Sequence, residues 1–225
     1  MEETKSMSIT SLITIPALIT LGITILRLVG ELEHWPKPWF SAGAGGGFAI
    51  VGISWLPIIF GPYFAIKLAG AGDPPSSVGK AIGLAFAGLG VLVLGALVAG
   101  AMTHLHHPNL SVVGLLVMLV AAFFPRIGWR SLGSTLLAYA FAARVPVVIV
   151  MLVAMLGNGG HGWGTHYDAV DPALASASFA RKFFLEAVVP QMTLWIGWTV
   201  VVGSIFGVIA TAIARRGKQA APAAA

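Results

Sequence analysis

The run at residues 81–100 reads AIGLAFAGLGVLVLGALVAG and carries no charged side chain over 20 consecutive positions. With a rise of about 1.5 Å per residue, an α-helix of this length spans about 30 Å, the thickness of the hydrocarbon core of a bilayer. The whole chain of 225 residues is 57% hydrophobic and 9% charged, whereas roughly a quarter of the residues of a soluble domain carry charge. The sequence therefore predicts an integral membrane protein.

Similar apolar runs recur along the chain and predict an all-α integral membrane protein, a compact bundle of six transmembrane helices. The spans are expected at residues 9–30, 45–69, 80–103, 110–124, 132–156 and 187–214. The fourth run has only 15 residues, and as a helix it covers about 22 Å unless it continues past Pro125. The second run contains Pro57 and Pro62, which predict a helix that is kinked or broken there.

The basic residues predict the orientation of these spans. With six spans, eight of the 13 basic residues fall on the side that holds both termini, and four fall on the other side. Because lysine and arginine are enriched in cytoplasmic loops, both termini are expected in the cytoplasm and the protein in the cytoplasmic (inner) membrane of a prokaryotic cell. The eight are Lys5, Lys67, Lys80, Arg126, Arg130, Arg215, Arg216 and Lys218; the four are Arg27, Lys37, Arg181 and Lys182.

The same topology divides the chain into regions. Residues 1–8 form a cytoplasmic N-terminus and residues 9–214 a single six-span membrane domain with an extracytoplasmic loop at 157–186. Residues 215–225 are polar and then rich in alanine and proline, which predicts a flexible cytoplasmic tail. The part of the loop at 171–186 is expected to form a short helix at the level of the lipid headgroups.

Histidines gather on the outer face in this topology, which holds all six of them and five of the eight acidic residues. Two lie in the glycine-rich loop GNGGHGWGTHYDAVDP, residues 157–172. Imidazole and carboxylate groups together suit a divalent transition metal such as zinc, iron, manganese or copper. The candidate ligands are Glu31, His34, His104, His107, His166 and Asp168. Two other interpretations stay open: interfacial histidines satisfied by water and headgroups, or a sensor of mildly acidic pH.

Arg144 is a second candidate site, because it falls near the middle of the fifth expected span. A charge at this depth is costly and usually faces the bundle interior or a wet cavity. No acidic residue lies mid-span elsewhere, so the expected partners are backbone carbonyls, Ser54, Thr199 or a bound anion. The alternative is a structural role in holding helices together. Broken helices often border the substrate sites of transporters, and the pathway candidates are Arg144, Ser54, Trp55, Pro57 and Pro62.

Other patterns concern packing and partners. Arg27 precedes Glu31 by four residues, a spacing at which the two side chains pair on a helix. Three GxxxG pairs indicate close helix contacts within the bundle, or in a homo- or hetero-oligomer. They are Gly43 with Gly47, Gly79 with Gly83, and Gly203 with Gly207. The net charge of +5 is spread over short loops and the C-terminus, so nucleic-acid binding is not expected, and the absence of cysteine excludes disulfides and thiolate metal sites.

These features predict a small transporter-like or accessory membrane protein, with a polar site in the membrane that opens outward between the outer histidines and acids. One alternative is a membrane metalloprotein, a hydrolase or redox enzyme, that uses the outer histidines and acids as ligands. The other is a non-catalytic subunit or assembly factor of a membrane complex, whose glycine faces point toward partners. The composition and spacing favour no particular substrate.

Overall fold

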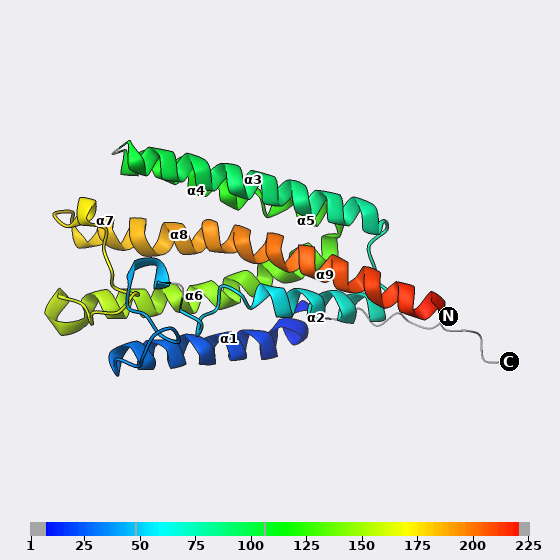
Figure 1. The fold of residues 1–225 in the computed structure, drawn as a ribbon, viewed down its shortest axis with the longest axis horizontal. Helices are drawn as coiled ribbons and strands as arrows, with labels where there is room; N and C mark the ends of the chain where they lie inside the picture. The colour runs from blue at the N-terminus through cyan, green and yellow to red at the C-terminus, as the bar shows by residue number, and fades with distance from the viewer. Residues whose placement is uncertain (1–7, 48, 106, 221–225) are drawn as a thin grey trace.

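The computed structural model describes residues 8–47, 49–105 and 107–220, and these residues contain helices and no β-strand. Most helices run along one long axis and form a bundle (Figure 1). The α-helices are α1 (Ile9–Leu32), α2 (Pro57–Gly70), α3 (Val78–His104), α4 (Pro108–Val120), α5 (Phe123–Gly128), α6 (Arg130–Gly160), α7 (Phe179–Phe183), α8 (Val189–Met192) and α9 (Leu194–Ala220). Short 3-10 turns lie at η1 (Ala44–Gly46) and η2 (Pro172–Leu174), and a π-helical turn at η3 (Phe184–Val188).

Among the described residues, five helical segments are long and apolar enough to cross a bilayer, as expected of a multi-pass membrane protein. They are Ile9–Leu32, Val78–His104, Leu110–Gly128, Arg130–Gly160 and Phe179–Arg215. Large apolar side chains point outward from them, including Ile15, Leu97 and Ile213, which are each more than 60% exposed. Such a surface is stable when lipid covers it.

The second expected span is only partly helical. Helix α2 begins at Pro57 and has 14 residues, which at about 1.5 Å per residue cover about 21 Å. Residues 43–47 and 49–56 before it form turns, bends and the 3-10 turn η1. Gly45, Gly46 and Gly47 all have positive φ, a conformation that favours glycine and ends helices. The break expected at Pro57 is therefore present, whereas Pro62 lies inside the continuing helix α2.

The helices at the fourth and sixth expected spans are longer than predicted. Helix continues past Pro125 to Gly128, because this proline lies in the first turn of α5, where a missing backbone N–H is tolerated. The last span begins at Phe179, and the expected interfacial helix at 171–186 is reduced to η2 followed by the start of this span. The Asp171 side chain accepts a hydrogen bond from the Ala173 backbone N–H at 2.8 Å and caps η2.

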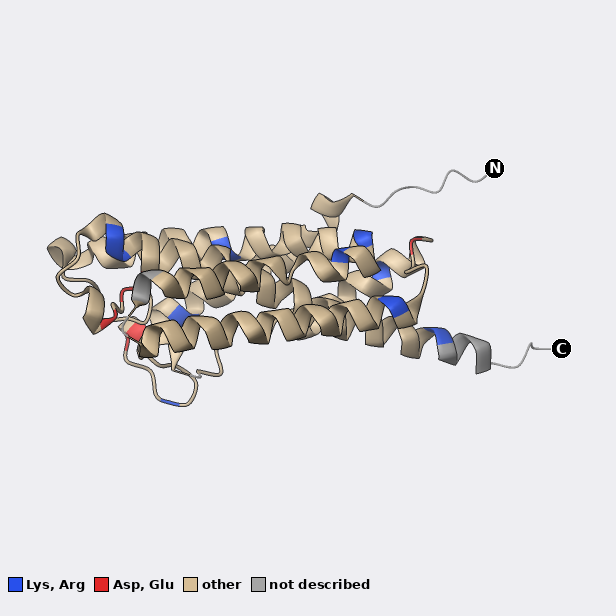
Figure 2. Cartoon of the chain, turned by 90° about the horizontal axis from the view of Figure 1, so that it is seen from above, with Lys and Arg blue, Asp and Glu red and all other residues tan. Residues whose placement is uncertain are grey.

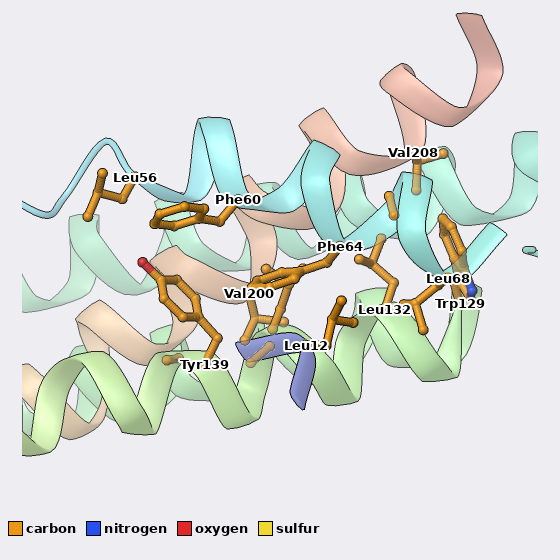
Figure 3. Close-up of a cluster of buried hydrophobic side chains, with 14 of the residues drawn as sticks. Leu12, Leu56, Phe60, Phe64, Leu68, Trp129, Leu132, Tyr139, Val200 and Val208 are labelled. Carbon is orange, nitrogen blue, oxygen red and sulfur yellow. The ribbon is translucent and has the colours of Figure 1, made fainter. Parts of the chain in front are cut away.

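The core is built around aromatic side chains from α2 and α6. Phe60 and Phe64 each pack edge-on against Tyr139, with ring centroids 5.4 and 5.5 Å apart (Figure 3). The Tyr139 hydroxyl lies 2.8 Å from the Thr20 hydroxyl of α1, so a buried hydrogen bond joins α1 to α6. Val200 from α9 completes the cluster. This cluster fixes four helices relative to one another.

Glycines let α2 and α9 approach closely. A Cβ atom at Gly61 would meet the Gly203 carbonyl, and one at Gly207 would meet the Gly61 carbonyl. The third GxxxG pair is therefore used within the bundle. Gly79 and Gly83 of α3 have no heavy atom within 4 Å of where a Cβ would stand, and Gly43 and Gly47 flank η1 outside any α-helix.

The bundle has two distinct ends. The start of α1 and the end of α9 lie at one end, together with the α2–α3 and α5–α6 connections (Figure 1). The opposite end holds all five described histidines: His34 after α1, His104 and His107 at the α3–α4 turn, and His161 and His166 after α6. Acidic residues gather at the two ends and are absent from the long middle of the described bundle (Figure 2).

Candidate functional site

A cavity of about 450 Å³ lies inside the histidine end of the bundle. Its wall combines α1, the irregular segment around η1, the middle of α6, the 166–172 loop and the segment from η3 to the start of α9. The side chains are mostly apolar, with Ile23, Ile53, Val147, Met151 and Leu194 among them. A cavity of this volume and lining is typical of a small-molecule site.

Arg144 contributes to this cavity from the middle of α6. The residue is only 4% exposed, and its Nε has no hydrogen-bond partner among the described residues. One terminal nitrogen donates to Oε1 of Gln191 at 3.5 Å, and the guanidinium carbon lies 4.6 Å from the centre of the Trp195 ring. No carboxylate of the described chain pairs with it. The positive charge of Arg144 is therefore buried without a counter-charge.

Gln191 reaches the cavity because the last span is distorted there. Pro190 lacks the N–H that would bond to the Glu186 carbonyl, and its ring would clash with that carbonyl in a regular helix. The chain instead forms the π-turn η3, the short helix α8 and a second break at Thr193, whose φ and ψ are −118° and −79°. Pro190, Gln191, Leu194 and Trp195 from this segment line the cavity. The Gln191 amide makes only long contacts, with Nε2 3.8 Å from the Met151 sulfur.

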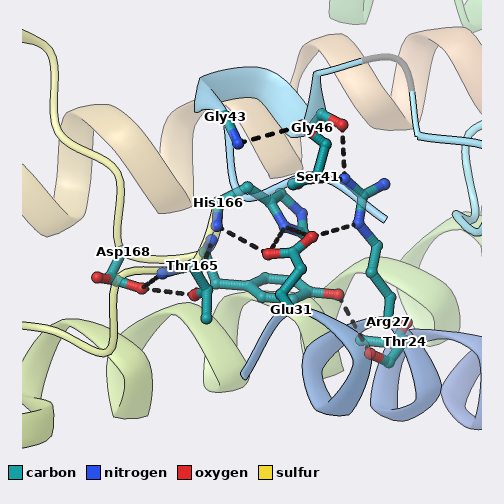
Figure 4. A network of polar contacts seen from close by, with 10 residues as sticks. Thr24, Arg27, Glu31, Ser41, Gly43, Gly46, Thr165, His166 and Asp168 are labelled. Carbon is teal, nitrogen blue, oxygen red and sulfur yellow. Dashed lines mark hydrogen bonds and ion pairs between the residues drawn. The ribbon is translucent and has the colours of Figure 1, made fainter. Parts of the chain in front are cut away.

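Arg27 is the second buried arginine of the wall, and its charge is compensated. Its Nε donates to Oε1 of Glu31 at 2.8 Å, which confirms the expected i,i+4 pair. One terminal nitrogen also donates to the carbonyls of Ser41 at 3.2 Å and Gly46 at 2.6 Å. Glu31 is 3% exposed and Arg27 8% exposed. This arginine thus joins α1 to the irregular segment of the second span (Figure 4).

His166 is held on the other side of Glu31. Its Nδ1 lies 2.7 and 2.8 Å from the two carboxylate oxygens, and its backbone N–H donates to Oε2 at 2.9 Å (Figure 4). Burial lowers the pKa of His166, although its hydrogen bond to the Glu31 carboxylate opposes this shift. Nδ1 donates to the Glu31 carboxylate, and burial disfavours the protonated imidazole. Glu31 receives the arginine and the histidine at once.

The 157–172 loop is fixed over the cavity by this contact and two others. The Tyr167 hydroxyl donates to the Thr24 carbonyl at 3.2 Å, and burial raises the pKa of this phenol well above its ordinary value. Asp168 accepts hydrogen bonds from the backbone N–H groups of Gly164 and Thr165, both at 2.8 Å, and from the Thr165 hydroxyl. The carboxylate of Asp168 therefore closes the loop on itself.

The six candidate metal ligands do not form one cluster. The structure brings together Glu31 and His166, while Asp168 is occupied by its own loop. His104 and His107 belong to the α3–α4 turn, on the opposite side of the bundle from α1 (Figure 1), and His34 lies with Glu31 in a separate small cavity. Among residues 8–47, 49–105 and 107–220 no group of three or more His, Cys, Asp and Glu could hold a metal ion. The expected shared metal site is thus not formed by these residues, because they belong to segments that lie next to different helices.

The pathway candidates are divided in the same way. Arg144 and Ser54 line the cavity, whereas Trp55, Pro57 and Pro62 do not. Trp55 is 40% exposed, and its indole N–H donates to the Ile50 carbonyl at 3.1 Å. Sequence reasoning missed Gln191 and Trp195 as partners of Arg144. The available signal was that Gln191 is the one amide side chain in the run 187–214 and directly follows Pro190.

No protein-family model, no curated protein and no solved structure matches this chain. The chemistry of the cavity therefore has to be read from its own residues. An arginine without a counter-charge, an amide with free hydrogen-bonding capacity and an indole ring are suited to hold a carboxylate or another small anion.

Proposed function

We propose that this chain is a six-span protein of the cytoplasmic membrane with both termini in the cytoplasm. The segment 43–70 would serve as a broken second span, with α2 as its helical half and the residues around η1 as its irregular half. Irregular backbone at membrane depth is tolerated where it lines a cavity, and Gly45, Gly46 and Ser54 do so here. The excess of basic residues, eight against four, on the side of the termini supports this orientation.

The function that the geometry supports best is transporter-like binding of a small organic anion in the cavity at Arg144. The observation that carries this proposal is that Arg144 is 4% exposed, lacks an acidic partner in the described chain and lines a cavity. A buried charge without a counter-charge lowers the stability of the folded protein by several kcal/mol, and such charges in membrane helices usually have a functional role. A bound anion supplies the missing counter-charge and accepts hydrogen bonds from the guanidinium.

Two interrupted helices support a transporter-like role. The irregular segment around η1 and the π-turn segment before α9 both contribute to the wall that contains Arg144. Discontinuous helices near the bilayer centre are common at the substrate sites of transporters, because their free backbone groups and hinge-like breaks serve binding and movement. The loop held by Glu31 and His166 covers the histidine end of the cavity and would act as the outer cover.

The test uses the protein purified in detergent and a panel of small carboxylates. Binding is followed by the thermal midpoint and by the fluorescence of Trp195, assigned by comparison with a Trp195→Phe variant. At a ligand concentration of about 100 times Kd, binding stabilises the protein by about 2.7 kcal/mol. We expect Arg144→Gln to remove the shift and Arg144→Lys to retain part of it. Equal shifts in wild type and Arg144→Gln would refute the proposed anion site.

An accessory-subunit role is a second candidate because one helix face is left open. Gly79, Gly83 and Gly90 of α3 have no heavy atom within 4 Å of their would-be Cβ positions, and small outward faces admit close contact with another helix. Gly83→Leu would then abolish association with a partner or a second copy in native membranes. Unchanged size of the detergent-extracted complex in that variant argues against this role.

A further inference from the structure

The outer part of the cavity wall carries charge of the opposite sign to Arg144. Asp171 is exposed, Glu186 is partly buried, and both line the cavity. The Asp171 backbone N–H donates to Oε1 of Glu186 at 3.2 Å, so the two residues are held together. Neither carboxylate forms an ion pair with a cation of the described chain. Arg181 and Lys182, on the same span as Glu186, are not part of the cavity lining.

These carboxylates make the cavity unfavourable for a simple anion. An anionic ligand that moves from the exposed Asp171 to the buried Arg144 passes two negative charges, which repel it. Arg144, which has no counter-charge among the described residues, favours a negative group of the ligand at the deep end of the cavity. The acidic pair favours a positive group at the outer end. A single ligand that carries both charges satisfies both ends.

The spacing of the two ends is set by the last span. Glu186 precedes Gln191, which contacts Arg144, by five residues. In a regular α-helix, with about 1.5 Å per residue, this separation would be about 7.5 Å, and the π-turn η3 makes the rise shorter. Val147, Met151 and Leu194 contribute apolar side chains to the cavity wall. These features fit a flexible or extended molecule with charged ends and an aliphatic middle.

We propose that the ligand of this cavity is a zwitterion, with its carboxylate on Arg144 and Gln191 and its ammonium group on Glu186 and Asp171. This inference rests on the proposed anion site at Arg144 and names the ligand class for it. The ammonium end faces the histidine end of the bundle, and the carboxylate end is the deeper one. A ligand of this kind enters past the acidic pair by attraction instead of repulsion.

The test compares ligands that differ only in the ammonium group. Hexanoate and 6-aminohexanoate, with shorter ω-amino acids down to glycine, are titrated into the purified wild-type protein while Trp195 fluorescence is recorded. We expect 6-aminohexanoate to bind at least about tenfold more tightly than hexanoate, which corresponds to about 1.4 kcal/mol. Hexylamine, which lacks the carboxylate, is expected to bind more weakly than either.

Two variants locate the ammonium end. Glu186→Gln should reduce the preference for 6-aminohexanoate over hexanoate by about tenfold. Glu33→Gln is the matched control, because Glu33 is exposed at the same end of the bundle but does not line the cavity. This control should leave the preference unchanged.

The outcomes separate the two proposals. If hexanoate binds as tightly as 6-aminohexanoate, and Arg144→Gln removes the binding of both, the anion site stands and the zwitterion inference is overturned. The same holds if Glu186→Gln leaves the preference intact. If Arg144→Gln leaves binding of all these ligands unchanged, the proposed anion site itself fails.

Discussion

Replacing each of the two buried arginines of the cavity by methionine should change stability in opposite directions. Arg27 and Arg144 are 8% and 4% exposed, so burial does not distinguish them. Arg27 is paired with Glu31 at 2.8 Å, and removal of one partner of a buried pair costs about 3 to 5 kcal/mol because the other charge is left uncompensated. We expect Arg27→Met to lower the free energy of unfolding by that amount.

Arg144→Met should instead raise the free energy of unfolding. A buried ion without a counter-charge is destabilising by several kcal/mol, and two effects reduce that penalty at Arg144. The Trp195 ring at 4.6 Å contributes about 2 kcal/mol, and the 3.5 Å contact with Gln191 contributes less than about 1 kcal/mol. The remaining penalty, about 1 to 3 kcal/mol, disappears when methionine fills a similar volume.

The assay is thermal unfolding of ligand-free protein in detergent, under conditions where unfolding is reversible. For a chain of this size about 1 kcal/mol corresponds to roughly 2 to 4 °C in the midpoint. Arg144→Met should therefore raise the midpoint by roughly 2 to 12 °C, and Arg27→Met should lower it by roughly 6 to 20 °C. A decrease in both variants would show that Arg144 holds the helices together, and the reasoning from an unused buried charge would be wrong.

Four further variants test the packing and the loop. The pKa of His166 is lowered by burial, so the unfolded chain binds the proton more strongly, and stability should fall as pH drops below about 6.5. In His166→Gln the thermal midpoint should change less between pH 7.5 and pH 5 than in the wild type, and an equal pH dependence of the midpoint in both proteins would contradict this. Gly61→Ala should lower the free energy of unfolding by about 1 to 3 kcal/mol, because the new Cβ collides with the Gly203 carbonyl. Gly83→Ala, where the space is open, should be neutral or stabilising. Equal thermal midpoints in the two variants would refute the close approach of α2 and α9. Tyr139→Phe should cost about 1 kcal/mol in chemical unfolding through the lost hydrogen bond to Thr20, and no loss would mean that this bond does not hold α1 to α6.

Several elements follow from sequence alone because their causes are local. The 20 uncharged residues at 81–100 suffice to predict a membrane helix, and Pro57 suffices to predict an interruption of the second apolar run, since a proline disrupts a helix through its own ring and missing N–H. The Arg27–Glu31 pair also follows, because a spacing of four residues brings two side chains together on any helix. Arg144 stands out by its depth in an apolar run.

The sequence was a poor guide to residues that meet across the bundle. Glu31 and His166 are 135 positions apart, and Asp168 turned inward to its own loop. The metal hypothesis grouped residues that share one side of the membrane, but a common side does not imply a common helix face. His104 and His107 lie across the bundle from Glu31 (Figure 1).

Hydropathy and charge in the sequence thus determined the class of the protein and singled out Arg144 as a buried charge. Only the tertiary structure decided what surrounds that charge, since Gln191 and Trp195 reach it through a π-turn that depends on Pro190 and on the packing of the last span. The physical reason is that membrane insertion depends on the average hydropathy of a whole run of residues. Contacts between helices depend instead on rotation and register, which are set where residues such as Gly61 and Gly203 bring two helix backbones together.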